Sequence, residues 1–136
     1  MPAEARAALD EANGTVSPTR RLSGVEAAYW VRYGERELLR WVLPHDEQTL
    51  LDALARLHAA GESALEPGSR YLGAFRAHGL LVPVWDLAPG TSAEDVEEPA
   101  VALGERLERA LAVTEPLTAD ERRARAGVVS RQLTLR

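Results

Sequence analysis

Three side chains of the types needed to bind an anion or to polarise a substrate group lie close together in the sequence: Arg76, His78 and Asp86. A helix-like pattern ending at Gly79 carries the first two, and the most apolar run, Leu80 to Leu87, carries the third. We therefore expect all three on neighbouring elements, as a ligand-binding or enzymatic site. The alternative is structural: an Arg–Asp pair would tie the helix to the strand, and the histidine would donate to a backbone carbonyl.

A second candidate is the pair His45-Asp46, which follows a predicted strand and precedes a predicted helix. A histidine beside a carboxylate could serve acid–base chemistry or bind a ligand. The alternative is that Asp46 caps the helix and His45 lies in a loop. The third histidine, His58, falls near a helix C-terminus, where a cation complements the helix dipole. The chain has no cysteine and no short histidine spacing, so we predict no metal site and no cofactor.

Other reaction classes find little support. No Gly-x-Ser-x-Gly elbow and no lysine-bearing phosphate loop occur. The arginines between Arg122 and Arg136 could meet nucleic acid, but a net charge of −5 disfavours that partner. Arginines of this kind more often pair with nearby carboxylates. The sequence therefore favours a non-enzymatic role.

The bulk composition is that of an ordinary globular protein. The 136 residues are 46% hydrophobic and 27% charged, which suits one domain over residues 1–136. No apolar run approaches the roughly 20 residues of a membrane span. The segment Met1–Arg6 lacks the apolar region of a secretion signal. We expect a cytoplasmic protein that does not contact a membrane.

The strands come from alternating and aromatic-rich runs. Ala28 to Tyr33 and Leu38 to Leu43 flank Gly34 and predict a hairpin. A two-residue turn would place Trp30 opposite Leu39, whereas a four-residue loop would place it opposite Trp41. Both registers put the tryptophans on one face, which we expect to be the core face.

A third strand is predicted over Leu80–Leu87. Pro83 should place it at a sheet edge or at a bulge, because proline lacks the N–H that pairing needs. We expect Trp85 in this strand, like Trp41 in the hairpin, to be largely buried.

Helices are predicted in the intervening segments. Asp46 to Gly61 contains the clearest leucine stripe, and Ser69 to Gly79 predicts a shorter helix carrying Tyr71, Leu72 and Phe75. Pro99 should start the main later helix. Thr118 to Glu121 forms a capping box for a last helix through Ala126 that Gly127 closes.

The two ends of the chain carry weaker patterns. Ala3–Ala12 predicts a short alanine-rich helix, Thr15–Ser23 a connector, and the tail Val128–Arg136 a further strand. Together the elements predict an α+β fold: a small, mainly antiparallel sheet, built from the hairpin plus one or two strands and covered by helices on one face.

Several blocks are distinctive as a set: Ala-Ala-Tyr-Trp at 27–30, Leu-Arg-Trp-Val-Leu-Pro-His-Asp-Glu at 39–47, Leu-Leu-Asp-Ala-Leu-Ala-Arg-Leu-His at 50–58, Phe-Arg-Ala-His-Gly-Leu-Leu-Val-Pro-Val-Trp-Asp-Leu at 75–87, and the ending from 117 to 136. With these blocks, the chain resembles the C-terminal half of an actinobacterial family of unknown function. Longer members of that family begin with a SEC-C zinc-binding motif, which requires cysteines that this chain lacks.

The resemblance implies a domain that acts beside other segments of a longer protein, and it implies no activity. We therefore expect a non-enzymatic binding or interaction domain whose partner is a protein or another part of a longer chain. Self-association is left open. The alternatives are a small-ligand or enzymatic site around Arg76, His78 and Asp86, and nucleic-acid association through the C-terminal arginines.

Overall fold

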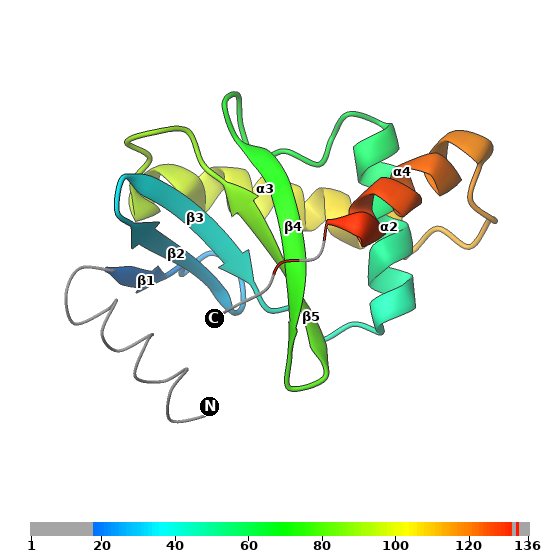
Figure 1. The fold of residues 1–136 in the computed structure, drawn as a ribbon, viewed down its shortest axis with the longest axis horizontal. Helices are drawn as coiled ribbons and strands as arrows, with labels where there is room; N and C mark the ends of the chain where they lie inside the picture. The colour runs from blue at the N-terminus through cyan, green and yellow to red at the C-terminus, as the bar shows by residue number, and fades with distance from the viewer. Residues whose placement is uncertain (1–17, 132, 134–136) are drawn as a thin grey trace.

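The computed structural model describes residues 18–131 and 133, and it has the predicted α+β architecture (Figure 1). The elements follow the chain in the order β1 (Thr19–Arg21), β2 (Ala28–Tyr33), β3 (Arg36–Trp41), α2 (Glu47–Ala59), β4 (Arg70–Ala77), β5 (Leu80–Asp86), α3 (Ala93–Leu111) and α4 (Ala119–Ser130). The five strands form one antiparallel sheet in the order β1-β2-β3-β5-β4.

The hairpin β2–β3 has the register of the two-residue turn. Arg32 pairs with Glu37 and Trp30 with Leu39, and Gly34 takes the positive φ of 59° that such a turn requires. Since side chains alternate along a strand, Trp30 and Trp41 share a face. Both are buried, at 5% and 4% exposure, so the predicted core face is confirmed.

The predicted helix over Ser69–Gly79 is wrong, because this segment is strand β4. The spacing of Tyr71, Leu72 and Phe75 imitates a helical stripe because Leu72 is the extra residue of a β-bulge between Tyr71 and Gly73. The residue taken for a helix cap, Ser69, instead closes a turn by accepting the Leu65 and Glu66 backbone N–H groups.

The predicted helix stop at Gly79 is instead the tip of the β4–β5 hairpin. His78 and Gly79 both have positive φ, 53° and 79°, which is the geometry of a tight type I′ turn. Pro83 predicted that its strand would lie at the edge of the sheet or at a bulge. The edge position is wrong, because β5 lies between β3 and β4. Its pairing with β3 stops at Val84, however, so Pro83 lies where β5 has a strand neighbour only in β4.

The helices form the second layer. In Figure 1, α3 lies behind the sheet, and α2 stands beside β4 with α4 packed on it. The core between these layers holds the leucines of α2, the tryptophans of the sheet, and Val96, Leu103 and Leu107 of α3. Trp41 and Trp85 meet there at 6.1 Å between ring centroids, and Trp85 is 1% exposed, so the predicted burial of both is confirmed.

Helix boundaries follow their caps. Asp46 caps α2 by accepting the Thr49 N–H, and Thr118 forms the predicted capping box with Glu121 at the start of α4. Helix α4 continues to Ser130, so the predicted end at Gly127 is wrong.

The predicted start of the long helix at Pro99 is also wrong. Helix α3 begins at Ala93, behind a second capping box made by Ser92 and Asp95, and it encloses Pro99. A good cap and a buried stripe outweigh the one hydrogen bond that a proline removes.

The ends of the described chain also differ from expectation. Thr19–Arg21, within the predicted connector, is strand β1, paired with β2. The predicted helix Ala3–Ala12 lies outside the described residues. The predicted strand Val128–Arg136 is wrong over its first three residues, which belong to α4. Beyond the helix, Arg131 and Leu133 are described, and the backbone N–H of Leu133 donates to the carbonyl of Ala74 at 2.8 Å.

Candidate functional site

The structure spreads the first predicted site along the β4–β5 hairpin. Arg76 pairs with Leu81 near one end of the hairpin, whereas Asp86 pairs with Arg70 at the other. Five residue positions of β5 separate Leu81 from Asp86, or roughly 17 Å at 3.3 Å per residue. His78 lies exposed in the turn. These side chains therefore do not converge on one ligand.

Each charged member has a different partner from the one expected. Arg76 donates two hydrogen bonds to the carboxylate of Glu47, at 2.6 and 2.7 Å, and thereby joins β4 to the start of α2. These bonds lower the pKa of Glu47 and raise that of Arg76. The carboxylate of Asp86 forms salt bridges with Arg36, at 3.0 Å, and with Arg70, at 3.7 Å.

The other histidines hold separate positions. His45 lies half-buried in the loop before α2, next to the helix cap Asp46. His58 lies in the last turn of α2, where its Nδ1 is 3.1 Å from the hydroxyl of Ser63. No group of three or more histidine, aspartate or glutamate side chains suited to a metal ion occurs within residues 18–131 and 133.

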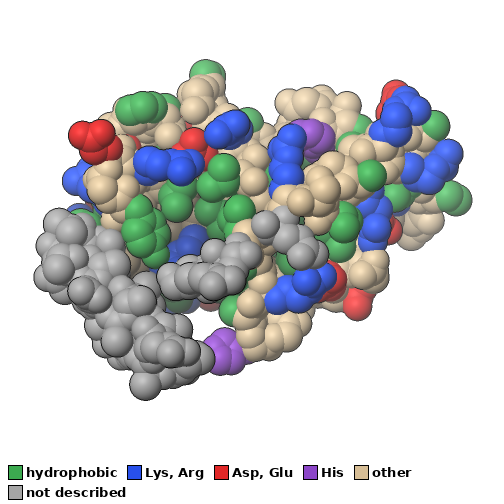
Figure 2. Space-filling model, in the orientation of Figure 1, with side chains coloured by type: hydrophobic (Ala, Val, Ile, Leu, Met, Phe, Trp, Pro, Cys, Tyr) green, Lys and Arg blue, Asp and Glu red, His purple; other side chains and the backbone are tan. Residues whose placement is uncertain are grey.

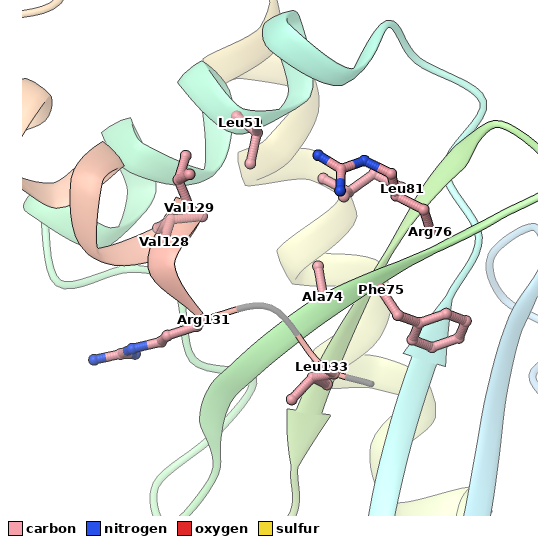
Figure 3. Close-up of a pocket in the computed structure, with 9 residues that line it drawn as sticks. All are labelled: Leu51, Ala74, Phe75, Arg76, Leu81, Val128, Val129, Arg131 and Leu133. Atoms are coloured by element: carbon pink, nitrogen blue, oxygen red, sulfur yellow. The ribbon is translucent and has the colours of Figure 1, made fainter. Parts of the chain in front are cut away.

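A small cavity lies between α2, α4 and β4 (Figure 3). It encloses about 60 Å³, and its lining is mainly aliphatic: Leu51, Ala74, Phe75, Arg76, Leu81, Val128, Val129, Arg131 and Leu133. Sites for drug-sized ligands have volumes of about 300 Å³ or more. This cavity is well below that size.

The arginines of α4 have local partners. Arg122 donates to the carbonyl of Leu117, Arg123 pairs with Asp120, and Arg125 bonds Asp52 of α2 at 2.6 Å. The predicted pairing with a nearby carboxylate is confirmed for Arg123, whereas Arg122 bonds a backbone carbonyl and Arg125 bonds a carboxylate of another helix. Their charge holds α4 to its own N-terminus and to α2.

The face of the sheet turned away from α3 offers a different kind of surface. We call it the outer sheet face; alternation along the strands assigns to it Tyr29, Val31, Tyr33, Leu38, Arg40, Phe75, Val82 and Val84. The three valines are buried, and the other five side chains are half-buried. Figure 2 views the molecule from this side and shows hydrophobic side chains over the strands with arginines among them. Tyrosine, phenylalanine and arginine are the residue types enriched at protein interfaces.

Arg40 is the most informative residue of this face. It lies on β3 between Tyr29 of β2 and Val84 of β5, and its side chain is half-buried. Its Nε atom is fully buried and has no hydrogen-bond partner in the described part of the chain. A buried donor next to a positive charge is costly when it is unpaired, so a group that accepts from Arg40 would relieve that cost.

Sequence reasoning missed Arg40. It lies between Leu39 and Trp41 in an alternating strand, where a charged residue ordinarily faces water. The signal that it differs is its row of strand neighbours, Tyr29 and Val84, and this row follows only once the order and register of the strands are known.

No curated protein and no solved structure matches the chain. Within the described residues, no helix is both long and apolar enough to cross a membrane. The model of one protein family matches residues 1–136 in full, and the chain accordingly belongs to that family, DUF5926, a family of unknown function.

Proposed function

We propose that this chain is a non-enzymatic interaction domain of a cytoplasmic protein, and that its outer sheet face binds an acidic segment of a protein partner. The partner is a separate protein or another segment of a longer chain. The observation that carries the proposal is the buried Nε of Arg40, which lacks an acceptor in the described residues.

The surroundings of Arg40 define the chemistry of the ligand. Guanidinium groups bind carboxylates through two parallel hydrogen bonds, and these bonds are stronger where water is excluded. Val31, Val82 and Val84 are almost fully buried, at 1%, 1% and 3% exposure, so Arg40 lies in an apolar setting. A partner with an acidic residue among aliphatic ones would match both properties of the face.

Two observations favour binding over catalysis. The histidines at positions 45, 58 and 78 lie on separate loops and helix ends, where none has a carboxylate bonded to it in the described chain. The cavity beside α4 is too small for a substrate of ordinary size. A binding role needs neither a convergent acid–base pair nor a deep pocket.

The test is a nuclear magnetic resonance titration of the full chain, in which the Nε–Hε signal of Arg40 is followed. The probe is a capped hexapeptide of alternating valine and glutamate, and its counterpart has lysine in place of glutamate. We expect the glutamate peptide to shift the Arg40 signal saturably at concentrations up to about 1 mM, a weak affinity of roughly 4 kcal/mol. The lysine peptide should leave the signal unchanged.

Two variants serve as controls. Arg40→Gln should abolish the peptide-induced shifts of the neighbouring amides, whereas Arg21→Gln should retain them, because Arg21 is exposed and pairs with Glu26. Shifts of equal size in the Arg40 variant, or none in wild type, would contradict the proposal. An equal response to inorganic phosphate would contradict the assignment of a protein partner.

The nucleic-acid alternative is tested separately by fluorescence anisotropy with short single- and double-stranded oligonucleotides. Micromolar binding at about 50 mM salt that vanishes near 200 mM would assign the chain to that class instead, because affinity through phosphates falls steeply with salt. We expect no such binding, because Arg122, Arg123 and Arg125 already have partners.

A further inference from the structure

The C-terminal end of the described chain pairs with the edge of the sheet. The N–H of Ala74 donates to the carbonyl of Arg131 at 3.0 Å, and the N–H of Leu133 donates to the carbonyl of Ala74 at 2.8 Å. One bond uses the N–H of Ala74 and the other uses its carbonyl, and their partners, Arg131 and Leu133, lie two positions apart in the sequence. This pattern is that of parallel strands, whereas every other pair in the sheet is antiparallel.

Strand β4 is where such pairing is available, because it is the last strand of the sheet and has β5 on one side only. Unpaired N–H and C=O groups along an edge strand are a template for another extended segment. At Ala74 this template is occupied by the chain's own Arg131 and Leu133.

Gly73 sets the shape of the acceptor. A Cβ atom at this position would lie 2.5 Å from the carbonyl oxygen of Arg131 and 3.0 Å from the side chain of Leu133. A leucine side chain therefore fills the space that a side chain at position 73 would take. Only glycine allows this approach without displacing the backbone of the incoming segment.

The side chains around the β4 edge at Gly73 and Ala74 determine which segment can pair with it. Leu133 lines the small cavity together with Leu51, Val128 and Val129, as Figure 3 shows. The guanidinium of Arg131 points away from β4 in the same view, so this residue contributes its carbonyl to the pairing. The site thus recognises an extended backbone with one aliphatic side chain above Gly73.

We propose that the edge of β4 at Ala74 is a strand-acceptor site, and that its exchange ligand is the C-terminal segment of a second copy of this chain. That segment fits by its chemistry, since the same residues fill the site within one molecule. Intramolecular pairing has the advantage of high effective concentration, so it should prevail in dilute solution. Exchange between copies, in the manner of a domain swap, then links the chains at high local concentration.

Two complementary variants separate donor from acceptor. Gly73→Ala blocks the acceptor and releases its own C-terminal segment, whereas Leu133→Asp spoils the segment and leaves the acceptor open. When unlabelled Gly73→Ala protein is added to isotope-labelled Leu133→Asp protein, we expect saturable shifts of the Gly73 and Ala74 amide signals. The doubly substituted protein, Gly73→Ala with Leu133→Asp, is the matched control and should cause none.

The shifts of the Gly73 and Ala74 amide signals decide whether the segment of one molecule binds the β4 edge of another. The same titration with labelled wild-type protein should give shifts at least about tenfold smaller, because its own segment competes. Absence of shifts in the complementary pair, with both variants folded by circular dichroism, would overturn the proposal.

Hydrogen exchange on wild-type protein provides a second test that needs no variant. The Ala74 amide hydrogen should exchange at least about tenfold faster than those of the β3–β5 ladder, because a removable segment opens locally. Protection of Ala74 equal to that of the ladder would also overturn the proposal. Neither test involves Arg40, so this inference and the proposed function can fail independently.

Discussion

At the scale of residues, two charged side chains of β3 show how differently one strand can use charge. Glu37 is 5% exposed, and its carboxylate accepts from Arg32 at 3.3 Å and from the Gly90 N–H at 2.7 Å. Arg40, on the opposite face, has no such partners among the described residues. The carboxylate thereby joins the loop before α3 to the sheet.

Trp41 is the residue on which the sheet and helix layers depend most directly. Its ring packs against Trp85 at 6.1 Å and lies beside Gly104 of α3, where a Cβ atom would be only 3.4 Å away. Trp41→Ala should lower the free energy of unfolding by about 3–5 kcal/mol, as large-to-small core substitutions do. A urea titration measures this, and a loss below about 1 kcal/mol would contradict the packing described.

Tyr71 gives the stability a defined dependence on alkaline pH. It is 4% exposed, its hydroxyl has no partner in the described chain, and burial raises its pKa from 10.0 to about 12. The unfolded chain therefore loses this proton at a lower pH than the folded chain. Stability should be intact below about pH 10 and should fall as the pH rises towards 12.

The measurement for Tyr71 is the urea midpoint at about pH 8 and about pH 11, in wild type and in Tyr71→Phe. The phenylalanine variant should lose less stability between the two pH values. It should also be at least as stable at the lower one, because it lacks a buried hydroxyl without a partner. Equal losses in the two proteins would show that Tyr71 is not the group that titrates.

At the scale of elements, α4 depends on its cap. It buries Val128 in the core, and most of its other side chains are exposed or half-buried, so packing contributes little to its start. Thr118→Ala removes the oxygen that accepts from the Glu121 N–H and should cost about 1 kcal/mol. Thermal melts compare the variant with wild type, and coincident curves would mean that the capping box does not stabilise the helix.

The elements also show which sequence patterns suffice for prediction. The β2–β3 hairpin and its core face were predictable because two alternating runs flank Gly34, although the turn length and register were left open. Helix α2 was predictable because its cap, leucine stripe and stop agree. Strand β4 was not, because a bulge at Leu72 turns period-two alternation into apparent helical spacing. The start of α3 was missed because proline favours the first turn of a helix, whereas the helix begins six residues earlier behind the Ser92–Asp95 capping box.

The candidate site was less predictable than the fold. Nearness in sequence suggested one group of Arg76, His78 and Asp86, but a hairpin places residues near its tip far from residues near its open end. The importance of Arg40 depends on which strands flank β3, and strand order arises from pairing between distant segments. No local pattern contains that information.

At the scale of the whole molecule, the two faces of the sheet differ in their packing. Helix α3 covers the inner face, where Trp30, Leu39 and Trp85 form the core. Charged groups between elements are paired: Glu97 of α3, for example, accepts from the backbone of Ser23 and Gly24, which lowers its pKa. The Nε atoms of Arg40 and Arg56 are exceptions, because each is buried without a hydrogen-bond partner in the described chain. The proposed function attributes that of Arg40 to the binding of an acidic partner.

The most direct measurement of that claim compares the unfolding free energies of wild type, Arg40→Met and Arg125→Met in urea. Arg125 bonds Asp52 at 2.6 Å, so its removal should cost about 1 kcal/mol. Arg40→Met should cost nothing, or should raise the unfolding free energy by about 1 kcal/mol, because it removes a half-buried charge without a partner. A loss of 1 kcal/mol or more in Arg40→Met would show that Arg40 serves the fold, and would contradict its assignment to a binding surface.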